Sequence, residues 1–309
     1  MNRRSFIQQL VKAGALTAAA APFAAAAKAQ EFQFKYMVGS SLYGKLPLSE
    51  ILPDIHKTGA SYIDIWPLGH ADQREQMEAM GHDAFEQMLK QHQLQLGCLT
   101  HYNLGPFGLA KEMPVAKRFG CKTMVCGARG PNGLSGKPLK QAVKVFVEQM
   151  KPHVAVAEEH DVTIAVENHG HSVIDTVDSL KWLCEYAPSK NLGVALAPYH
   201  LESAEVDAKG LGKLIEDLGN CIAIFYAWQY GRGCMKKLPK EQELLQMPGR
   251  GDMDFRPAVK ALKKVNYQGF TEIFMHPVPR GIPILPTASQ TTAEINRSRA
   301  YLEEVRKNI

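Results

Sequence analysis

The sequence predicts an α/β protein, and within that class a single (β/α)8 TIM barrel. From residue 33 onward, short apolar runs, turns and amphipathic helical stretches alternate along the chain. Eight such strand–helix units in about 275 residues is the number that closes one barrel. A doubly wound open sheet is the alternative. The strand count and the lack of a glycine-rich phosphate turn after the first strand count against it.

Each element of the barrel is expected from its own run of residues. We expect strands at residues 34–39, 62–65, 94–99, 122–126, 162–166, 192–196, 222–226 and 269–274. Helical patterns include residues 73–91, 139–159, 176–186 and 255–265. No Pro/Ser linker or change in composition divides residues 30–309, which predicts one domain. The two longest strand-to-helix loops, 229–254 and 276–290, should lie over the C-terminal mouth of the barrel.

Residues 1–29 have the pattern of an export leader. Arg3 and Arg4 stand in a segment that resembles the twin-arginine signal, and an Ala-rich stretch and an Ala27-Lys28-Ala29 cleavage pattern follow. A retained membrane anchor is the alternative, but the apolar run is short and is interrupted by Pro22. We therefore expect cleavage, a periplasmic location and no stable membrane insertion.

The charge of the chain changes once the leader is removed. The leader carries four basic residues and no acidic one, so 32 basic residues face 31 acidic ones in the remainder. This near-neutral balance argues against a nucleic-acid partner. The six cysteines, Cys98, Cys121, Cys126, Cys184, Cys221 and Cys234, show no zinc spacing. We expect buried thiols, and an oxidising periplasm leaves a disulfide open.

Polar residues gather where the predicted strands end. The apolar run 162–166 is followed by Glu167, Asn168 and His169, and the last predicted strand carries Glu272 shortly before His276. In a barrel, the C-terminal ends of the strands converge on one site. Other polar and aromatic residues at such ends are Asp64, Trp66, His70, Thr100, His101, Tyr102, Tyr199, His200, Tyr226, Trp228, Gln229 and Arg280.

Two carboxylates with imidazoles between them suit two kinds of chemistry. They can hold a divalent metal through oxygen and nitrogen ligands. They can also act as acid and base on either side of a bound sugar carbonyl. The aromatic residues Trp66, Tyr102, Tyr199 and Trp228 offer apolar faces to a sugar ring, with core packing as the alternative for each.

These residues together resemble the xylose-isomerase-like barrel superfamily. The resemblance rests on Glu167-Asn168-His169, on Tyr199-His200, on the turn at residues 249–255 and on Glu272. That superfamily contains sugar isomerases and epimerases, hydroxypyruvate isomerase, inosose dehydratase and type IV endonucleases. The resemblance implies small-molecule carbohydrate substrates.

The resemblance also implies a divalent-metal site made of Glu, Asp, His and Glu from four strand ends. Glu167 and Glu272 match the first and last of these, but Ala197 stands at the aspartate position and Tyr226 at the histidine position. A rebuilt site for Mn, Mg, Zn or Co and a metal-free site both remain open. The candidate metal ligands are Glu167, His200, Gln229 and Glu272, with His169 and His276 as further substitutes.

The preferred hypothesis is an enzyme that removes a proton next to a carbonyl. Glu167 and Glu272 would be the acid–base pair, with His200 as the third catalytic group. A metal or the guanidinium groups of Arg250 and Arg280 would stabilise the enediolate oxygen. The expected substrate-binding residues are Trp66, His101, Tyr102, His169, Trp228, Arg250, His276 and Arg280. The outcome could be isomerisation, epimerisation or β-elimination.

Two other functions stand beside the enzyme. A non-catalytic periplasmic sugar-binding protein with a degenerate metal site would explain Ala197 and Tyr226. An endonuclease fits the superfamily but not the export signal or the charge balance. The Pro-rich segment 277–283 is expected to be either a rigid lid that positions Arg280 or a contact between subunits of a homo-oligomer.

Overall fold

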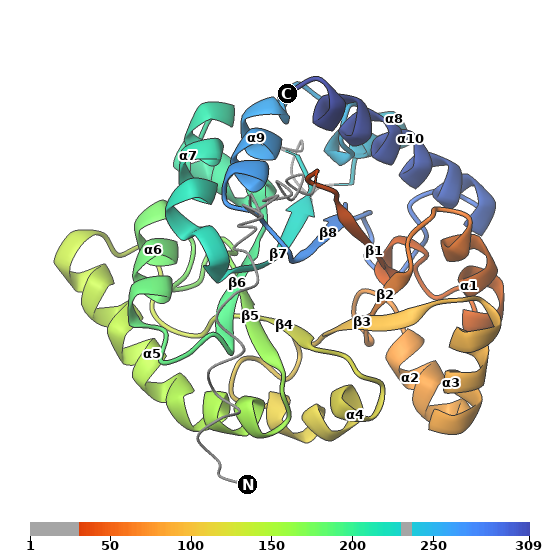
Figure 1. The fold of residues 1–309 in the computed structure, drawn as a ribbon, viewed down its shortest axis with the longest axis horizontal. Helices are drawn as coiled ribbons and strands as arrows, with labels where there is room; N and C mark the ends of the chain where they lie inside the picture. The colour runs from red at the N-terminus through yellow and green to blue at the C-terminus, as the bar shows by residue number, and fades with distance from the viewer. Residues whose placement is uncertain (1–30, 230–236) are drawn as a thin grey trace, which may run out of the picture. The chain divides into compact units, whose positions relative to one another are not determined.

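The structure is a computed structural model that describes residues 31–229 and 237–309. Within it, Gln33–Ile309 forms one compact unit. The predicted leader and Cys234 lie outside the described residues. Eight parallel strands close into a barrel in the order of the sequence, and helices surround it, which confirms the predicted fold class (Figure 1).

The strands occupy the predicted runs. They are β1 (Lys35–Gly39), β2 (Tyr62–Ile65), β3 (Gln95–Thr100), β4 (Thr123–Gly127), β5 (Thr163–Glu167), β6 (Leu192–Leu196), β7 (Ile222–Ala227) and β8 (Phe270–Ile273). Every boundary lies within one residue of the prediction. The reason is that barrel strands are covered on both faces, so that they appear in the sequence as uninterrupted apolar runs.

The helices form the outer layer. They are α1 (Leu48–His56), α2 (Gln73–Met80), α3 (His82–Gln91), α4 (Met113–Arg118), α5 (Gly136–Glu159), α6 (Val177–Tyr186), α7 (Ala208–Leu218), α8 (Lys240–Glu243), α9 (Arg256–Lys264) and α10 (Ala288–Lys307). Short 3-10 turns are η1 (Ser40–Leu42), η2 (Leu109–Lys111), η3 (Pro198–Ala204), η4 (Gly219–Cys221) and η5 (Leu244–Gln246).

One predicted helix is two helices in the structure. Residues 73–91 have a continuous helical pattern, but α2 ends at Met80 and α3 begins at His82. Between them Gly81 has a φ of +84°, in the region that glycine adopts without steric cost and that ends a helix.

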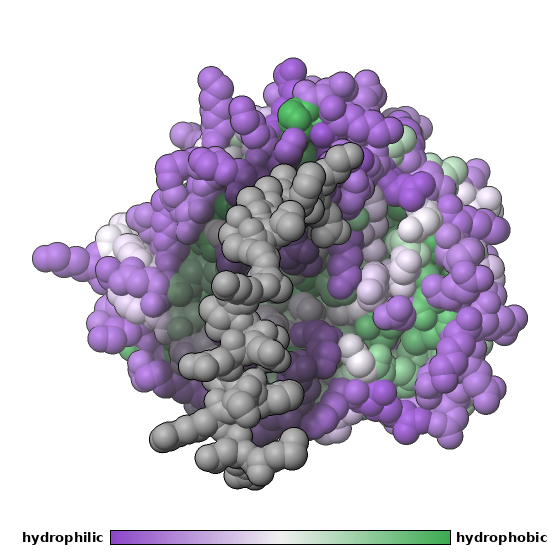
Figure 2. Space-filling view, viewed as in Figure 1, coloured by the Kyte–Doolittle hydropathy of each residue, from purple (hydrophilic) through white to green (hydrophobic). Residues whose placement is uncertain are grey.

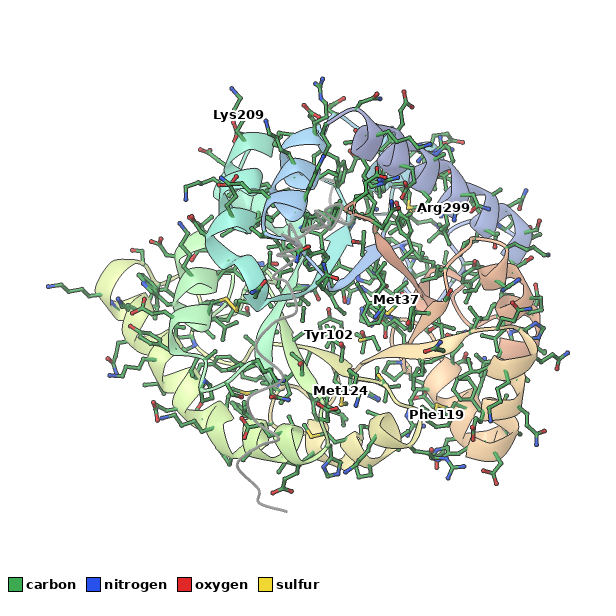
Figure 3. The ribbon with its side chains drawn as sticks, in the orientation of Figure 1. Met37, Tyr102, Phe119, Met124, Lys209 and Arg299 are labelled. Atoms are coloured by element: carbon green, nitrogen blue, oxygen red, sulfur yellow. A yellow bond between two sulfur atoms is a disulfide. The ribbon has the colours of Figure 1, made fainter. Side chains whose placement is uncertain are left out.

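Side chains divide between the centre of the ring and its outside. Figure 3 shows Met37 and Tyr102 toward the middle of the ring, whereas Lys209 on α7 extends outward. Figure 2 shows hydrophilic residues over the outer faces of the helices, with hydrophobic residues exposed between them. Among the described residues, we find no helix with the length and apolar character needed to span a bilayer.

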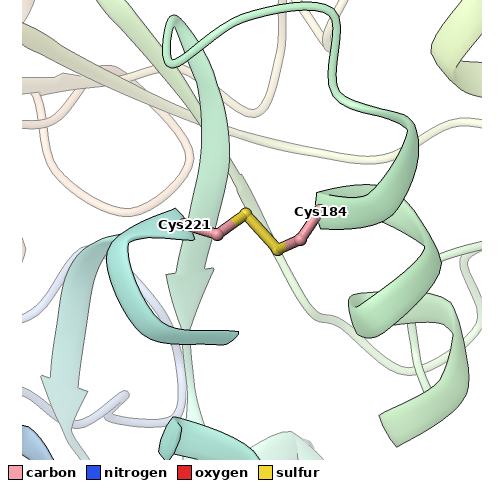
Figure 4. Close-up of a disulfide and its surroundings, with 2 residues drawn as sticks. All are labelled: Cys184 and Cys221. Carbon is pink, nitrogen blue, oxygen red and sulfur yellow. A yellow bond between two sulfur atoms is a disulfide. The ribbon is translucent and has the colours of Figure 1, made fainter. Parts of the chain in front are cut away.

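A disulfide joins two neighbouring strand–helix units. It connects Cys184 on α6 with Cys221 in η4, just before β7 (Figure 4). The expectation of buried thiols is therefore wrong for these two residues. Their partners could not be identified from sequence because they meet only when the two units pack side by side. Cys98, Cys121 and Cys126 are free and buried, as expected.

Candidate active site

Three carboxyl groups lie at the C-terminal ends of barrel strands. We call this end of the barrel the mouth. These groups belong to Asp64 on β2, Glu167 on β5 and Glu272 on β8, and all three residues are at most 3% exposed. The charges of Asp64 and Glu167 both raise the pKa of Glu272, so both groups lie close to it. The structure thus brings together the two glutamates that the sequence singles out.

Glu167 faces an imidazole. Its Oε1 lies 3.6 Å from Nε2 of His200, and its Oε2 has no hydrogen-bond partner among the described residues. Burial raises the pKa of Glu167 to about 8, although the positive charge of Arg280 acts in the opposite direction. Burial also holds the pKa of His200 well below its ordinary value, so this imidazole is neutral at pH 7.

Glu272 lies deeper and has no hydrogen-bond partner among the described residues on either oxygen. Its Oε1 lies so close to β1 that a Cβ at Gly39 would be 2.3 Å from it, so any side chain at that position would displace the carboxyl group. On the adjacent strand Tyr226 stands in register with Glu272, and its buried hydroxyl also has no partner in the described part of the chain. Burial and then the neighbouring acids raise the pKa of both groups.

Asp64 has a structural role as well as a charge. Its Oδ2 accepts hydrogen bonds from Nε1 of Trp66 at 2.6 Å and from Oγ1 of Thr100 at 2.7 Å. Burial raises the pKa of Asp64 to about 7 despite these hydrogen bonds. Asp64 therefore fixes the indole of Trp66, which the sequence predicts to contact substrate.

Aromatic rings form the walls of the mouth. The rings of Tyr199 and Trp228 are stacked, with centroids 4.2 Å apart and an interplanar angle of 7°. The ring of His200 contacts Trp228 edge-on, with a centroid distance of 4.9 Å. On the other side, Trp66 stacks on Phe274 at 5.3 Å. Such faces suit the apolar side of a sugar ring.

Further imidazoles lie among these rings. The ring of His276 contacts those of Trp66, Trp228 and His70, and its centroid lies 4.9 Å from that of His70. The ring centroids of His169 and His200 are 4.1 Å apart. Burial lowers the pKa of His70 to about 4, and it also lowers the pKa of His169 and His276. The charge of Arg280 lowers the pKa of all of them, which places its guanidinium near the mouth.

Tyr102 lies at the border of this group, and three other predicted site residues have partners elsewhere. The ring of Tyr102 is 5.6 Å from Trp66. His101 turns toward Glu112, 3.6 Å away, in a cavity lined by Arg74 and other residues between β3 and the helices. Arg250 makes hydrogen bonds to both carboxylate oxygens of Glu294 on α10.

Gln229 is the third predicted site residue with partners elsewhere. Its amide nitrogen donates to the carbonyl oxygens of Leu245 and Met247, and its Oε1 accepts from the backbone N–H of Met253. The carboxamide therefore holds the loop after β7 together and has no oxygen turned toward Glu167 or Glu272. The physical reason is that a buried amide in a long loop satisfies the nearest backbone groups first.

The donor set does not fit the divalent metal that the resemblance implies. At the end of β6, Ala197 offers only a methyl group, and its backbone N–H and C=O are both bonded to the side chain of Asn168. At the end of β7 the ligand position holds the phenol of Tyr226, whose raised pKa keeps it protonated. No group of three or more His, Cys, Asp and Glu side chains in residues 31–229 and 237–309 has the arrangement to hold a metal ion.

Two residues of the site are given no role from the sequence. Asp64 stands out there only as a polar residue at a strand end, although a charge inside a short, otherwise apolar strand needs an explanation. Nothing in the sequence indicates Gln246. It lies in η5, where its Oε1 accepts from Nε1 of Trp228 at 3.0 Å and its Nε2 donates to the carbonyl oxygen of His276 at 3.0 Å. It thus joins the ends of β7 and β8.

Comparisons with solved structures show the same fold at low sequence identity. An IolI protein with a bound zinc atom matches with a TM-score of 0.69 and 17% identity, over 89% of this chain and 99% of that one. An L-ribulose 3-epimerase matches with 0.65 and 14%, over 89% and 95%. The 3-keto-D-glucoside 4-epimerase of E. coli matches with 0.64 and 15%, over 88% and 100%.

Sequence comparison gives the family. No curated protein matches this chain. The family described as "Xylose isomerase-like TIM barrel" matches residues 52–301, which contain seven of the eight strands and every carboxyl group of the mouth. This chain belongs to the xylose isomerase-like TIM barrel family.

Proposed function

We propose that this protein is an isomerase or epimerase of sugars or keto-sugars that moves a proton at the carbon next to a carbonyl group. The observation that carries the proposal is the convergence of Glu167 and Glu272 in one buried mouth, with His200 3.6 Å from Glu167. Two carboxyl groups in different environments are what a proton removal followed by a proton return requires.

The environments of the two glutamates suggest their roles. Burial raises the pKa of both glutamates, but the charge of Arg280 lowers that of Glu167, which lies beside His200, so we assign Glu167 as the base. Glu272 is enclosed by Asp64, Glu167 and the phenol of Tyr226, which favours its protonated form, so we assign it as the acid.

The proton steps then balance. Glu167 takes the proton from carbon, the C–H electron pair forms a C=C bond, and the carbonyl electron pair moves to oxygen. Glu272 returns a proton to carbon and the carbonyl reforms. Glu167 then holds the substrate proton while Glu272 has lost its own, and exchange with solvent beside His200 restores both. If the carbonyl reformed while the hydroxyl group on the next carbon left as water with the proton of Glu272, the product would be that of an elimination instead.

The walls of the mouth favour a sugar. Stacked Tyr199 and Trp228, together with Trp66, provide apolar faces, and neutral imidazoles provide hydrogen bonds to hydroxyl groups. The structural neighbours include an L-ribulose 3-epimerase and a 3-keto-D-glucoside 4-epimerase, which supports free sugars and keto-glucosides as the first substrates to try.

Hydrogen–deuterium exchange tests this function. Purified protein in D2O is incubated with a panel of free ketoses and 3-keto-glucosides, and proton NMR follows the C–H next to the carbonyl. We expect exchange and a new sugar signal for at least one member, and neither with the E167Q/E272Q double variant. Saturable binding in calorimetry without exchange for any member would instead favour the non-catalytic sugar-binding protein.

We further propose that the chain is exported through the twin-arginine pathway to the periplasm. The leader motif supports this, and so does the Cys184–Cys221 disulfide, because such bonds are rare in reducing compartments. Cell fractionation with thiol labelling tests it. We expect processed protein in the periplasm with these two cysteines unlabelled, whereas cytoplasmic protein with both thiols labelled would contradict export.

A further inference from the structure

Four strands place unsatisfied oxygen atoms at the floor of the mouth. They are Oδ1 of Asp64, Oε2 of Glu167, Oη of Tyr226 and both carboxyl oxygens of Glu272, none of which has a hydrogen-bond partner among the described residues. Buried polar atoms without partners cost stability, so groups of them usually mark a place where a ligand supplies the missing hydrogen bonds.

The side chains at these strand ends are a poor ligand set for a divalent cation. Ala197 provides no donor atom, and Tyr226 presents an O–H, which is a hydrogen-bond donor and a poor ligand while it keeps its proton. The oxygen of Gln229 is bonded to Met253, so this amide does not replace the missing ligand. Asp64, Glu167, Glu272 and His200 are left as donors, and in the described part of the chain no three or more such groups are arranged to hold a metal ion.

Tyr226 is well placed for a different task. It is the register partner of Glu272, so the two side chains leave adjacent strands at the same level of the barrel. Its ring packs against Phe274 at 5.2 Å, which holds the phenol in position, while its hydroxyl remains without a partner in the described structure. A preorganised donor in a buried site stabilises developing negative charge more than the same donor does in water.

We infer that this site works without a resident divalent metal, and that the hydroxyl of Tyr226 donates the hydrogen bond to the substrate oxygen that becomes negative when Glu167 removes the proton. The role of Tyr226 rests on the proposed function, whereas the lack of a resident metal rests on the donor set alone. Tyr226 keeps its own proton throughout, so the proton balance given above is unchanged.

Metal binding tests the first part without reference to activity. Elemental analysis of the purified protein, followed by calorimetric titration with Mn²⁺, Co²⁺ and Zn²⁺, is compared with the A197D/Y226H variant, which restores the two missing ligands. We expect far less than one metal per wild-type chain, no change of melting temperature with EDTA, and stoichiometric binding only in the variant.

Several results would overturn this part. A wild-type protein that carries a stoichiometric divalent cation, or that melts at a lower temperature in EDTA, contradicts the inference. A folded A197D/Y226H variant that binds no cation contradicts the explanation from the donor set. If circular dichroism shows that the variant does not fold, the wild-type measurements decide alone. If no sugar is turned over, the proposed function fails while the metal result still stands.

Kinetics with the identified sugar test the second part. Y226F removes only the hydroxyl, so we expect kcat to fall by about 10²-fold with little change in KM, as for loss of one donor to an oxyanion. Y43F is the matched control, because Tyr43 is an equally buried tyrosine whose hydroxyl bonds Thr292 on α10, and its kcat should match the wild type. An unchanged kcat in Y226F would overturn the role of Tyr226.

Discussion

Two buried glutamates in this protein have opposite surroundings. Glu294 on α10 is 5% exposed and receives hydrogen bonds from Arg250 and Arg297, which hold its pKa below the ordinary value even though burial acts to raise it. Glu272 in the mouth is fully buried, has no hydrogen-bond partner in the described residues, and its pKa is raised. The protein thus provides hydrogen-bond donors for the carboxylate of Glu294, whereas its described residues provide none for the carboxyl group of Glu272.

This difference in hydrogen bonding distinguishes a carboxyl group that supports the fold from one that is available for chemistry. A buried charge that the chain satisfies contributes to folding, whereas an unsatisfied one is retained at a cost to stability and is a candidate for chemistry. The outer layer of the barrel and its mouth should therefore respond in opposite ways to the same substitution.

The largest expected effect is on turnover. E167Q and E272Q should each lower kcat by about 10³-fold, because each removes one of the two proton-transfer groups. E294Q makes the same chemical change outside the mouth and should leave kcat unchanged. Kinetics on the identified sugar measure this, and a large loss of kcat in E294Q would remove the distinction between the two regions.

The next largest effect is on the free energy of unfolding when the disulfide is removed, since this bond closes a loop outside the mouth. The C184S/C221S variant should lose about 3 kcal/mol of unfolding free energy, because the reduced unfolded chain gains freedom. Its kcat at low temperature should equal that of the wild type. Urea denaturation measures the free energy, and a loss of kcat in the still-folded variant would link this region to the site.

A smaller effect should follow from removing the charge of Glu294. E294Q should cost about 2 kcal/mol, because Arg250 and Arg297 lose their charged acceptor. E272Q should cost much less, since no hydrogen bond from the described residues is lost. Thermal melting of both variants at the same pH compares them, and equal destabilisation would contradict the assignment of Glu272 to function.

The smallest effect is on the pH dependence of stability, which should have opposite signs for Glu167 and Glu294. The pKa of Glu167 is raised to about 8, so its burial penalises folding more as pH rises from about 4.5 to 8. E167Q should therefore gain stability relative to wild type over that window, by several degrees in Tm. The pKa of Glu294 is lowered, so the deficit of E294Q should shrink as pH falls below about 4.5. Melting curves from pH 2 to 9 test both signs.

Much of the fold and part of the site could be predicted from the sequence. The strands are apolar runs, and Glu167, His200 and Glu272 follow from their position at strand ends. The pairing of Arg250 with Glu294 and the use of Gln229 by its own loop could not be predicted, because both depend on segments that meet only after the loop after β7 and α10 have packed. The helix break at Gly81 was missed because its flanks share one periodicity.

The hydrogen bonds of Asn168 bear on how such a site can change over generations. The side chain of Asn168 donates to the carbonyl oxygen of Ala197 and accepts from its N–H. Both partners are main-chain groups, so these two hydrogen bonds between the ends of β5 and β6 do not require a particular side chain at position 197. Substitutions there can add or remove an acidic group while the architecture persists, which makes this position a natural point for one barrel to diverge into enzymes of different chemistry.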